Sequence, residues 1–232
     1  FSYEKNNDVL MDVNFEISKG SKIGICGESG SGKTTFADIL SGLTKSDRGL
    51  IKVNDKKLDR EEVLIRSFSY CGQKNFLIED TIKNNITFKD GITIDEELFV
   101  KKLLKIVELD KFIENLRDNV DTLISAENGI KLSSGQAQRL CIARCLFSNK
   151  NFMIFDESFN NLDLVNRGNV LNNILENFNR NSLIMISHDV SLFEKFDKII
   201  VFKSGKILST GNFNDLKLNN EYFKQLLYKN EK

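Results

Sequence analysis

The sequence predicts an α/β fold in which a parallel β-sheet carries helices on both faces. Three observations lead to this prediction. Short apolar runs of strand length lie at residues 22–26, 152–155 and 183–186. Segments with helical periodicity, such as residues 165–177, separate such runs. A glycine-rich loop joins the first apolar run directly to a helical segment that begins near Thr35.

Composition and charge narrow the class of protein. The 232 residues are enough for one large domain or two small ones, and 41% hydrophobic with 28% charged residues is an ordinary globular balance. Lys+Arg and Asp+Glu number 33 each, so the net charge is zero, which argues against a general nucleic-acid-binding surface. No apolar run reaches the roughly 18 residues of a membrane span, and no secretory signal is present. Because the first residue is Phe1, we expect a piece of a longer protein.

The four cysteines do not indicate a metal site. They are Cys26, Cys71, Cys141 and Cys145, and neither a C-x-x-C pair nor a histidine partner accompanies them. Cys141 and Cys145 stand four residues apart on a predicted helix and therefore share a face. We interpret all four as reduced thiols in a cytosolic core.

The remaining elements follow in chain order. Residues 1–22 alternate like strands, residues 49–54 resemble an edge strand, and residues 68–71 form a short strand that ends before Gly72. The region from about 80 to 147 is mostly helical, and Ser133-Ser134-Gly135 opens a long helix within it. Ser204-Gly205 predicts a hairpin between residues 198–202 and 206–208, and the tail from Phe213 to Leu227 is helical.

The segment from Gly27 to Thr34 fits G-x-x-x-x-G-K-[ST], the phosphate-binding P-loop, in its required strand–loop–helix context. Its glycines let backbone N–H groups surround phosphate oxygens, and the helix N-terminus adds positive charge. Lys33 is expected to reach the β- and γ-phosphates, and Thr34 to bind Mg²⁺. The alternative is a glycine-rich turn with a chance lysine. The predicted phosphate-binding residues are Gly27, Ser29, Gly30, Ser31, Gly32, Lys33, Thr34 and Thr35.

Two later strand ends complete a predicted phosphoryl-transfer site. The apolar run 152–155 leads directly into Asp156 and Glu157, which is the pattern of a Walker B strand. We therefore expect Asp156 to lie in the coordination shell of Mg²⁺ and Glu157 to polarise the attacking water. A strand that ends in a solvated acidic turn is the alternative. His188, the only histidine, follows residues 183–186 and is predicted to contact the γ-phosphate, because ligands bind at the carboxyl ends of such strands. A purely structural histidine is the alternative.

At this point the chain resembles the nucleotide-binding domain of ABC ATPases. Leu132-Ser133-Ser134-Gly135-Gln136, followed by residues 137–140, resembles the signature motif of that family. The P-loop, the signature, the Walker B strand with its glutamate and the downstream histidine occur in the family's order. The resemblance extends from Tyr3 to His188.

The resemblance implies roles for further residues. Gln73 resembles the Q-loop glutamine, which senses Mg²⁺ and faces the membrane partner. Asp163 ends a segment similar to the D-loop, which reaches across a dimer interface. Tyr3 resembles the aromatic residue that stacks on adenine, and an ordinary strand aromatic is the alternative. Ser133, Gly135 and Gln136 are implied to bind the nucleotide of a second subunit.

Two segments resemble exporters in particular. Residues 81–86 look like T-I-x-x-N-I, and residues 122–129 look like T-x-V-G-E-x-G, although residues 124–126 depart from that pattern. Two other departures concern activity: Ser134 replaces the first glycine of the usual pair, and Asn160-Asn161 replaces Ser-Ala in the D-loop.

The family further implies a P-loop NTPase core with an N-terminal antiparallel β region and an inserted helical subdomain. We expect residues 1–73 and 139–232 to form the core and residues 74–138 the subdomain. The implied cofactors are ATP and Mg²⁺. The implied partners are a second ABC domain and upstream transmembrane domains. The implied location is the cytoplasmic face of the membrane. No nucleic acid is expected. An importer ATPase, or a soluble ABC protein of translation or DNA maintenance, remains the alternative, although no sustained heptads lie between Gly27 and Leu132.

Overall fold

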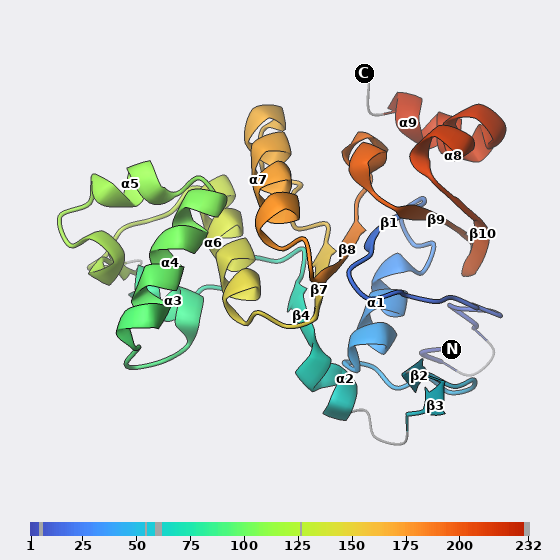
Figure 1. Ribbon diagram of the computed structural model, residues 1–232, viewed down its shortest axis with the longest axis horizontal. Helices are drawn as coiled ribbons and strands as arrows, with labels where there is room; N and C mark the ends of the chain where they lie inside the picture. Colours follow the sequence, from blue (N-terminus) through green and yellow to red (C-terminus); the bar gives the residue numbers. More distant parts are fainter. Residues whose placement is uncertain (5–6, 54, 59–61, 126, 230–232) are drawn as a thin grey trace. The chain divides into compact units, whose positions relative to one another are not determined.

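The computed structural model describes residues 1–4, 7–53, 55–58, 62–125 and 127–229. The chain divides into two compact units, and each is described by itself (Figure 1). Unit 1 comprises Phe1–Tyr70, Lys150–Glu157 and Arg180–Lys232, and unit 2 comprises Cys71–Asn149 and Ser158–Asn179. The predicted helical subdomain, residues 74–138, lies within unit 2, which also includes residues 71–73, 139–149 and 158–179.

A six-stranded sheet forms the centre of unit 1, in the order β10-β9-β1-β8-β7-β4 (Figure 1). The strands are β1 (Lys22–Cys26), β4 (Phe68–Cys71), β7 (Phe152–Asp156), β8 (Ser182–Ile186), β9 (Lys198–Lys203) and β10 (Lys206–Gly211). Strand β1 pairs in parallel with β8 and β9, and β7 pairs in parallel with β8. Only β10 runs antiparallel to its neighbour β9 among the pairs described for this sheet. The predicted α/β fold with a parallel sheet is therefore confirmed.

Alternation along β1 explains how both faces of this sheet are covered. Ile23 and Ile25 join Phe36 and Ala37 of α1 (Lys33–Ser41) in one buried cluster. Gly24 points to the other face, where an added Cβ would lie 2.5 Å from the ring of Phe193 in η2 (Val190–Lys195). Successive strand residues face opposite sides, so glycine at this position lets η2 lie close to the sheet.

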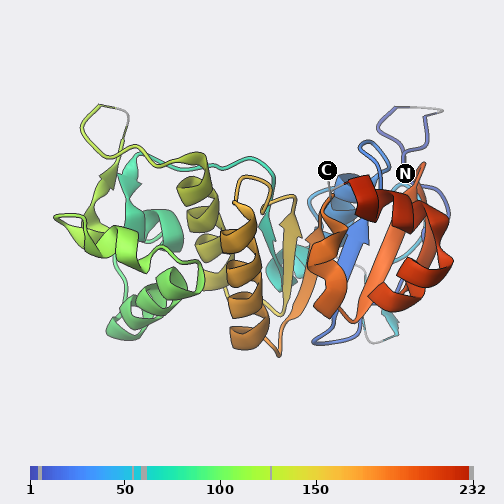
Figure 2. The ribbon, with the colours of Figure 1, turned by 90° about the horizontal axis from the view of Figure 1, so that it is seen from above.

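The carboxyl-terminal part of unit 1 is a hairpin followed by two helices. Ser204 and Gly205 both have positive φ, 47° and 76°, as a two-residue type I′ turn between β9 and β10 requires. The tail predicted to be helical forms two helices, α8 (Phe213–Asn219) and α9 (Glu221–Lys229), which lie side by side in Figure 1 and Figure 2. Asn220 separates them because its side chain donates to Ser209 Oγ at 2.7 Å and accepts from Phe223 N at 2.8 Å.

The alternating segment at residues 9–17 does not form the predicted strand. Val13, Phe15 and Ile17 are partly buried against the core, but Val9 N donates to Phe1 O and Met11 N to Gly205 O, so no regular ladder develops. Antiparallel pairing in this part of the chain is limited, among the described residues, to a Ser2–Asp8 bridge and to the short strands β2 and β3. The latter span Lys52–Val53 and Lys56–Lys57, so the predicted edge strand at 49–54 is shorter than expected. Asn54 itself lies outside the described residues.

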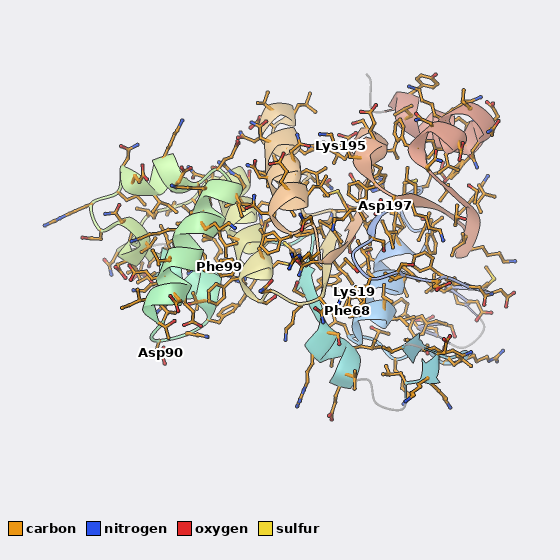
Figure 3. The ribbon with its side chains drawn as sticks, in the orientation of Figure 1. Lys19, Phe68, Asp90, Phe99, Lys195 and Asp197 are labelled. Carbon is orange, nitrogen blue, oxygen red and sulfur yellow. The ribbon has the colours of Figure 1, made fainter. Side chains whose placement is uncertain are left out.

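Two further contacts complete the framework of unit 1. The short helix α2 (Glu62–Ser67) leads into β4, and Phe68, labelled in Figure 3, stacks on Phe152 of β7 with ring centroids 4.8 Å apart. Asp197, also labelled there, accepts a hydrogen bond from Lys22 N at 2.7 Å. These contacts hold β4 beside β7 and the start of β1 beside the loop before β9.

Unit 2 is mainly helical, as predicted for residues 80–147. Its elements are β5 (Asp80–Thr81), α3 (Ile82–Thr87), α4 (Ile94–Ile106), α5 (Asp110–Glu114), η1 (Asn119–Asp121), β6 (Leu123–Ile124), α6 (Ser134–Phe147) and α7 (Leu164–Asn177). Helix α6 packs on α3 and α4, and Phe99 of α4 faces Phe147 of α6 with centroids 5.9 Å apart (Figure 3). None of the helices within the described residues combines the length and apolar character needed to cross a bilayer.

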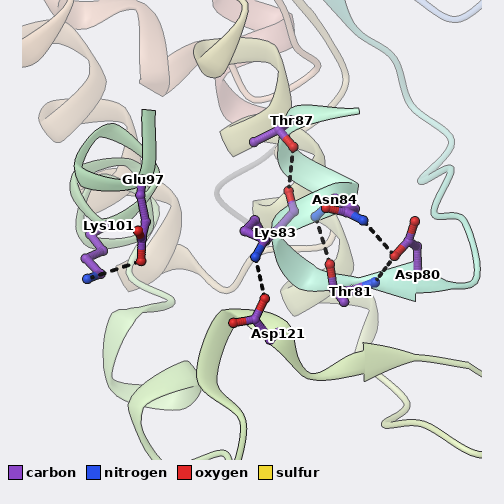
Figure 4. A network of polar contacts seen from close by, with 8 residues as sticks. All are labelled: Asp80, Thr81, Lys83, Asn84, Thr87, Glu97, Lys101 and Asp121. Atoms are coloured by element: carbon purple, nitrogen blue, oxygen red, sulfur yellow. Dashed lines mark hydrogen bonds and ion pairs between the residues drawn. The ribbon is translucent and has the colours of Figure 1, made fainter. Parts of the chain in front are cut away.

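Polar contacts fasten α3 into this unit (Figure 4). Thr81 caps the helix by accepting from Asn84 N at 3.0 Å, and Lys83 forms an ion pair with Asp121 of η1. Asn85 is fully buried, and its amide pairs with both the N–H and the carbonyl of Ile78. Arg144 of α6 donates to the Asn85 carbonyl at 2.7 Å. The T-I-x-x-N-I segment noted in the sequence therefore has a clear structural role.

Candidate active site

The P-loop needs glycine at the positions where the backbone turns into the left-handed region. Gly27, Gly30 and Gly32 have φ values of 149°, 76° and 100°. A Cβ on Gly27 would lie 2.3 Å from the carbonyl oxygen of Phe202, and one on Gly32 would lie 2.7 Å from Leu10. The loop is further held by Gly205 N, which donates to Ser31 O at 3.0 Å. Backbone conformation and close packing both explain the glycine pattern.

Lys33 lies inside this loop. Its side chain is only 4% exposed, and Nζ donates to the carbonyls of Gly27 at 3.0 Å and Glu28 at 2.8 Å. Burial lowers the pKa of this ammonium group, while the charges of Glu157 and Asp156 act in the opposite direction. The loop thus holds a buried cation within the electrostatic reach of two carboxylates.

The loop and the start of α1 fit a bound anion. The first helical hydrogen bond runs from Phe36 N to Gly32 O, so the N–H groups of Lys33, Thr34 and Thr35 have no acceptor inside the helix. The Ser31 hydroxyl is buried without a hydrogen-bond partner among the described residues. Unused donors at a helix N-terminus next to a buried ammonium are what phosphate oxygens require.

Asp156, at the carboxyl end of β7, fits a divalent cation. It is 3% exposed, and its Oδ2 accepts a hydrogen bond from the Tyr70 hydroxyl at 3.0 Å. Its Oδ1 is buried and has no hydrogen-bond partner in the part of the chain that the structure describes. Burial raises the pKa of this carboxyl, whereas the hydroxyls of Thr34 and Tyr70 lower it. A buried carboxylate oxygen without a donor, close to a threonine hydroxyl, suits Mg²⁺.

Glu157 and His188 come together because β7 and β8 are parallel and in register. Asp156 pairs with Ile186, so the residues that follow both strands meet at one sheet edge. Glu157 N donates to Ile186 O at 3.0 Å, and Glu157 Oε1 lies 2.8 Å from His188 Nε2. Glu157 has a φ of 51°, an unusual conformation for a residue with a side chain. Strained backbone held by surrounding structure is common at functional sites.

Tyr3 lies beside the start of α1. Its hydroxyl is 3.2 Å from Thr35 Oγ1, and its ring meets Phe1 edge-on with centroids 4.9 Å apart. The side chain is 62% exposed. A ring that is both exposed and close to the P-loop is compatible with stacking on a base, which stays a prediction.

The signature residues lie in unit 2, at the start of α6. Ser133 is its N-cap and forms a capping box with Gln136: Ser133 Oγ accepts from Gln136 N at 3.2 Å, and Gln136 Oε1 accepts from Ser133 N at 2.8 Å. A Cβ on Gly135 would lie 3.1 Å from Asn161 O. Ser134 is the first helical residue and has negative φ, so serine costs little at that position.

The two other residues implied by the resemblance also belong to unit 2. Gln73 is exposed in the bend that follows β4. Asp163 is the N-cap of α7 and accepts from Asn166 N at 3.0 Å, which lowers the pKa of its carboxyl. The segment before it is anchored by Asn161 N, which donates to Gln138 Oε1 at 2.8 Å. Of the segment 122–129, Ala126 lies outside the described residues.

Two tyrosines near the P-loop were not identified from the sequence. Tyr70 contacts Asp156, and burial with the nearby charges of Asp156 and Asp38 raises the pKa of its hydroxyl, which stays a proton donor. Tyr222 of α9 accepts a hydrogen bond from Glu28 N at 3.2 Å. Neither belongs to a local motif. Only the position of Tyr70 three residues before Gln73 could have drawn attention to it.

Unit 1 therefore brings together Tyr3, Lys33, Thr34, Asp156, Glu157 and His188 around one phosphate-binding loop. The arrangement offers donors and a cation for phosphate, carboxylate oxygen for a divalent metal, and a carboxylate–imidazole pair for a proton. This set of groups suits phosphoryl transfer from a nucleotide.

Comparisons with known proteins agree with this chemistry. A family model described as "ABC transporter" matches residues 10–160. The chain is 37% identical over 96% of its length to the Lacticin-481/lactococcin-DR transport/processing ATP-binding protein of Lactococcus lactis, of which it covers 31%. It is 32% identical over 93% of its length to the ATP-dependent lipid A-core flippase of Coxiella burnetii, of which it covers 37%. The chain thus spans about a third of the length of these curated relatives.

A solved structure extends the similarity to the fold. A bacterial Atm1-family ABC exporter with ATP bound superposes with a TM-score of 0.90 at 28% identity. The match covers 100% of this chain and 41% of that one.

Proposed function

The chain belongs to the ABC transporter family, and we propose that it is the ATP-hydrolysing domain of an exporter whose membrane domains lie elsewhere in the transporter. The relatives and the solved neighbour support this proposal, because they are named as a flippase, a transport/processing protein and an exporter. Importers and soluble ABC proteins are not favoured by these similarities. The domain would then lie at the cytoplasmic face of a membrane and contact transmembrane domains. Gln73 would sense Mg²⁺ and face those membrane domains.

The observation that supports hydrolysis most directly is the contact between Glu157 and His188. Glu157 directly follows Asp156 in the chain. In the proposed mechanism, Lys33 and the N–H groups of the P-loop bind the β- and γ-phosphates. Thr34 and Asp156 hold Mg²⁺, which supplies charge neutralisation at the phosphate oxygens when bound. Glu157 accepts a proton from the attacking water, and His188 orients that carboxylate and contacts the γ-phosphate.

We further propose that one chain contains only half of each complete site. Ser133 and Gly135 sit at the N-terminus of α6, where the first N–H groups of the helix have no acceptor inside it and suit a γ-phosphate. In a head-to-tail dimer, these residues would cover the nucleotide bound by Lys33 of the partner, and Asp163 would lie near the interface. ATP would then close the dimer and hydrolysis would release it.

Static light scattering tests this arrangement. Glu157→Gln with ATP and Mg²⁺ is expected to shift toward twice 26.5 kDa, because the bridging nucleotide is no longer hydrolysed. Adding Ser133→Arg should abolish the shift by placing bulk at the phosphate position.

A matched control separates this effect from loss of a helix cap. Thr93 caps α4 with the same kind of capping box, formed with Glu96, so Glu157→Gln with Thr93→Arg should still dimerise. If the Ser133→Arg double variant dimerised equally well, completion of the site by a second chain would be wrong.

A further inference from the structure

Tyr70 holds one oxygen of the carboxylate at the end of β7. Its hydroxyl donates to Asp156 Oδ2 at 3.0 Å, although the two residues are 86 positions apart in the chain. The tyrosine ring packs against the core cluster of unit 1, which fixes where the hydroxyl lies. A rigid donor on a buried carboxylate restricts rotation of that carboxylate.

The other oxygen of the same carboxylate is left for a different partner. Asp156 Oδ1 is buried and accepts no hydrogen bond from any described residue. A carboxylate with one oxygen bound to the protein and the other without a donor is oriented before any ligand arrives. Metal-binding carboxylates are commonly oriented by such outer hydrogen bonds.

A second carboxylate lies near the same hydroxyl. Asp38 of α1 is within hydrogen-bonding reach of Tyr70, and it stands four residues after Thr34, on the same face of the helix. Tyrosine has one hydroxyl proton, so it can donate to only one of the two carboxylates at a time. In this structure it donates to Asp156.

We propose that Tyr70 is a positioning residue that orients Asp156 for the divalent cation of the active site. The proposal rests on the proposed function, which assigns Thr34 and Asp156 to Mg²⁺. Without the Tyr70 hydroxyl, Asp156 loses the donor that β4 supplies and keeps only the Thr34 hydroxyl, which is itself assigned to the cation. The carboxylate is then less firmly oriented, so cation binding weakens while nucleotide contacts made by Lys33 remain.

Mn²⁺ binding in the presence of ADP tests this role, with free Mn²⁺ followed by electron paramagnetic resonance. Tyr70→Phe keeps the ring and removes only the hydroxyl, and it is expected to weaken Mn²⁺ binding by roughly ten- to a hundred-fold. Tyr228→Phe makes the same change on an exposed side chain of α9 and should match the unmodified chain. Binding of ADP in the presence of EDTA should be equal in all three proteins.

The outcomes distinguish this proposal from the one on which it rests. If the unmodified chain bound no Mn²⁺ with ADP, the proposed function itself would be wrong. If the unmodified chain and Tyr70→Phe bound Mn²⁺ equally, only the role of Tyr70 would be overturned. Tyr70→Leu removes the ring as well, and weakening seen in that variant alone would assign the effect to ring packing and likewise overturn the proposal.

Discussion

Oε1 of Glu157 lies 2.8 Å from Nε2 of His188, and the two residues follow neighbouring parallel strands. The imidazole is 40% exposed and the carboxylate 15%, so the pair lies at the surface of unit 1 and water can reach it. One of the two glutamate oxygens is therefore oriented by the histidine. His188 is therefore expected to affect hydrolysis partly by orienting the Glu157 carboxylate.

His188→Ala is expected to lower ATP turnover by roughly a hundred-fold, because it removes the group that orients Glu157. ATP binding should change little, since Lys33 and the P-loop donors remain. Steady-state hydrolysis together with calorimetric titration of ATP measures both quantities. A variant that loses affinity for ATP and keeps its turnover at saturation would contradict this role.

Asp156→Asn is expected to stabilise the nucleotide-free chain by about 1 kcal/mol at neutral pH while removing metal-dependent activity. Burial raises the pKa of Asp156 in the folded state. Between the ordinary aspartate pKa and that raised value, the folded chain binds a proton that the unfolded chain has lost. The free energy of unfolding therefore falls as pH rises from the ordinary aspartate pKa to the raised pKa of Asp156. Above the raised pKa, the full loss of stability caused by the buried charge is present.

Urea unfolding near the ordinary aspartate pKa and at neutral pH checks the sign. The advantage of Asp156→Asn over the unmodified chain should grow as pH rises. Asp90→Asn is a suitable control, because Asp90 is exposed (Figure 3) and should show no such growth. An advantage that shrank with rising pH would mean that the carboxyl is stabilising at this position.

Glycine-to-alanine changes should have opposite signs at two positions. Gly27→Ala is expected to destabilise the chain by roughly 2 kcal/mol, since φ is 149° and the new Cβ would lie 2.3 Å from Phe202 O. Gly168→Ala lies inside α7 with nothing within 4 Å of the new Cβ, and it should stabilise by about 0.5–1 kcal/mol. Thermal unfolding of both variants measures these effects. Equal shifts of the melting temperature in the two variants would refute the steric account of the P-loop.

The four cysteines should be unreactive in the folded chain. All are buried, and burial raises the pKa of the Cys26 thiol to about 12 and also raises the pKa values of Cys71 and Cys141. Thiolate is the reactive form, so a chromogenic disulfide reagent at pH 8 should modify less than one thiol within minutes. Four should react in denaturant. Rapid reaction of any thiol in the folded chain would contradict its burial.

Local motifs explain why much of the fold and site could be predicted from the sequence. The P-loop is contiguous, and its strand and helix flank it directly, so residues 22–41 carry both the structure and the expected chemistry. Asp156, Glu157 and His188 were predictable because each follows a buried apolar run. Ser133 was predictable as a helix start because its capping box is local.

Features that depend on tertiary contacts could not be predicted in this way. The alternation at residues 9–17 has strand periodicity, yet its side chains pack on the core without a neighbouring ladder. The helical character of the tail was predicted, but its division at Asn220, which bonds to Ser209 on β10, was not. Tyr70 approaches Asp156 only because β4 and β7 are neighbours in the sheet. Each of these depends on distant residues, which no local pattern reports.

Single-turnover hydrolysis of ATP by Glu157→Gln tests the central claim most directly. The variant should bind ATP with unchanged affinity and hydrolyse it roughly 10² to 10⁴-fold more slowly, because it loses the group that accepts a proton from water. Glu194→Gln, a matched change at an exposed residue of η2, should hydrolyse ATP at the normal rate. Turnover by Glu157→Gln within a few-fold of the unmodified chain would contradict the account.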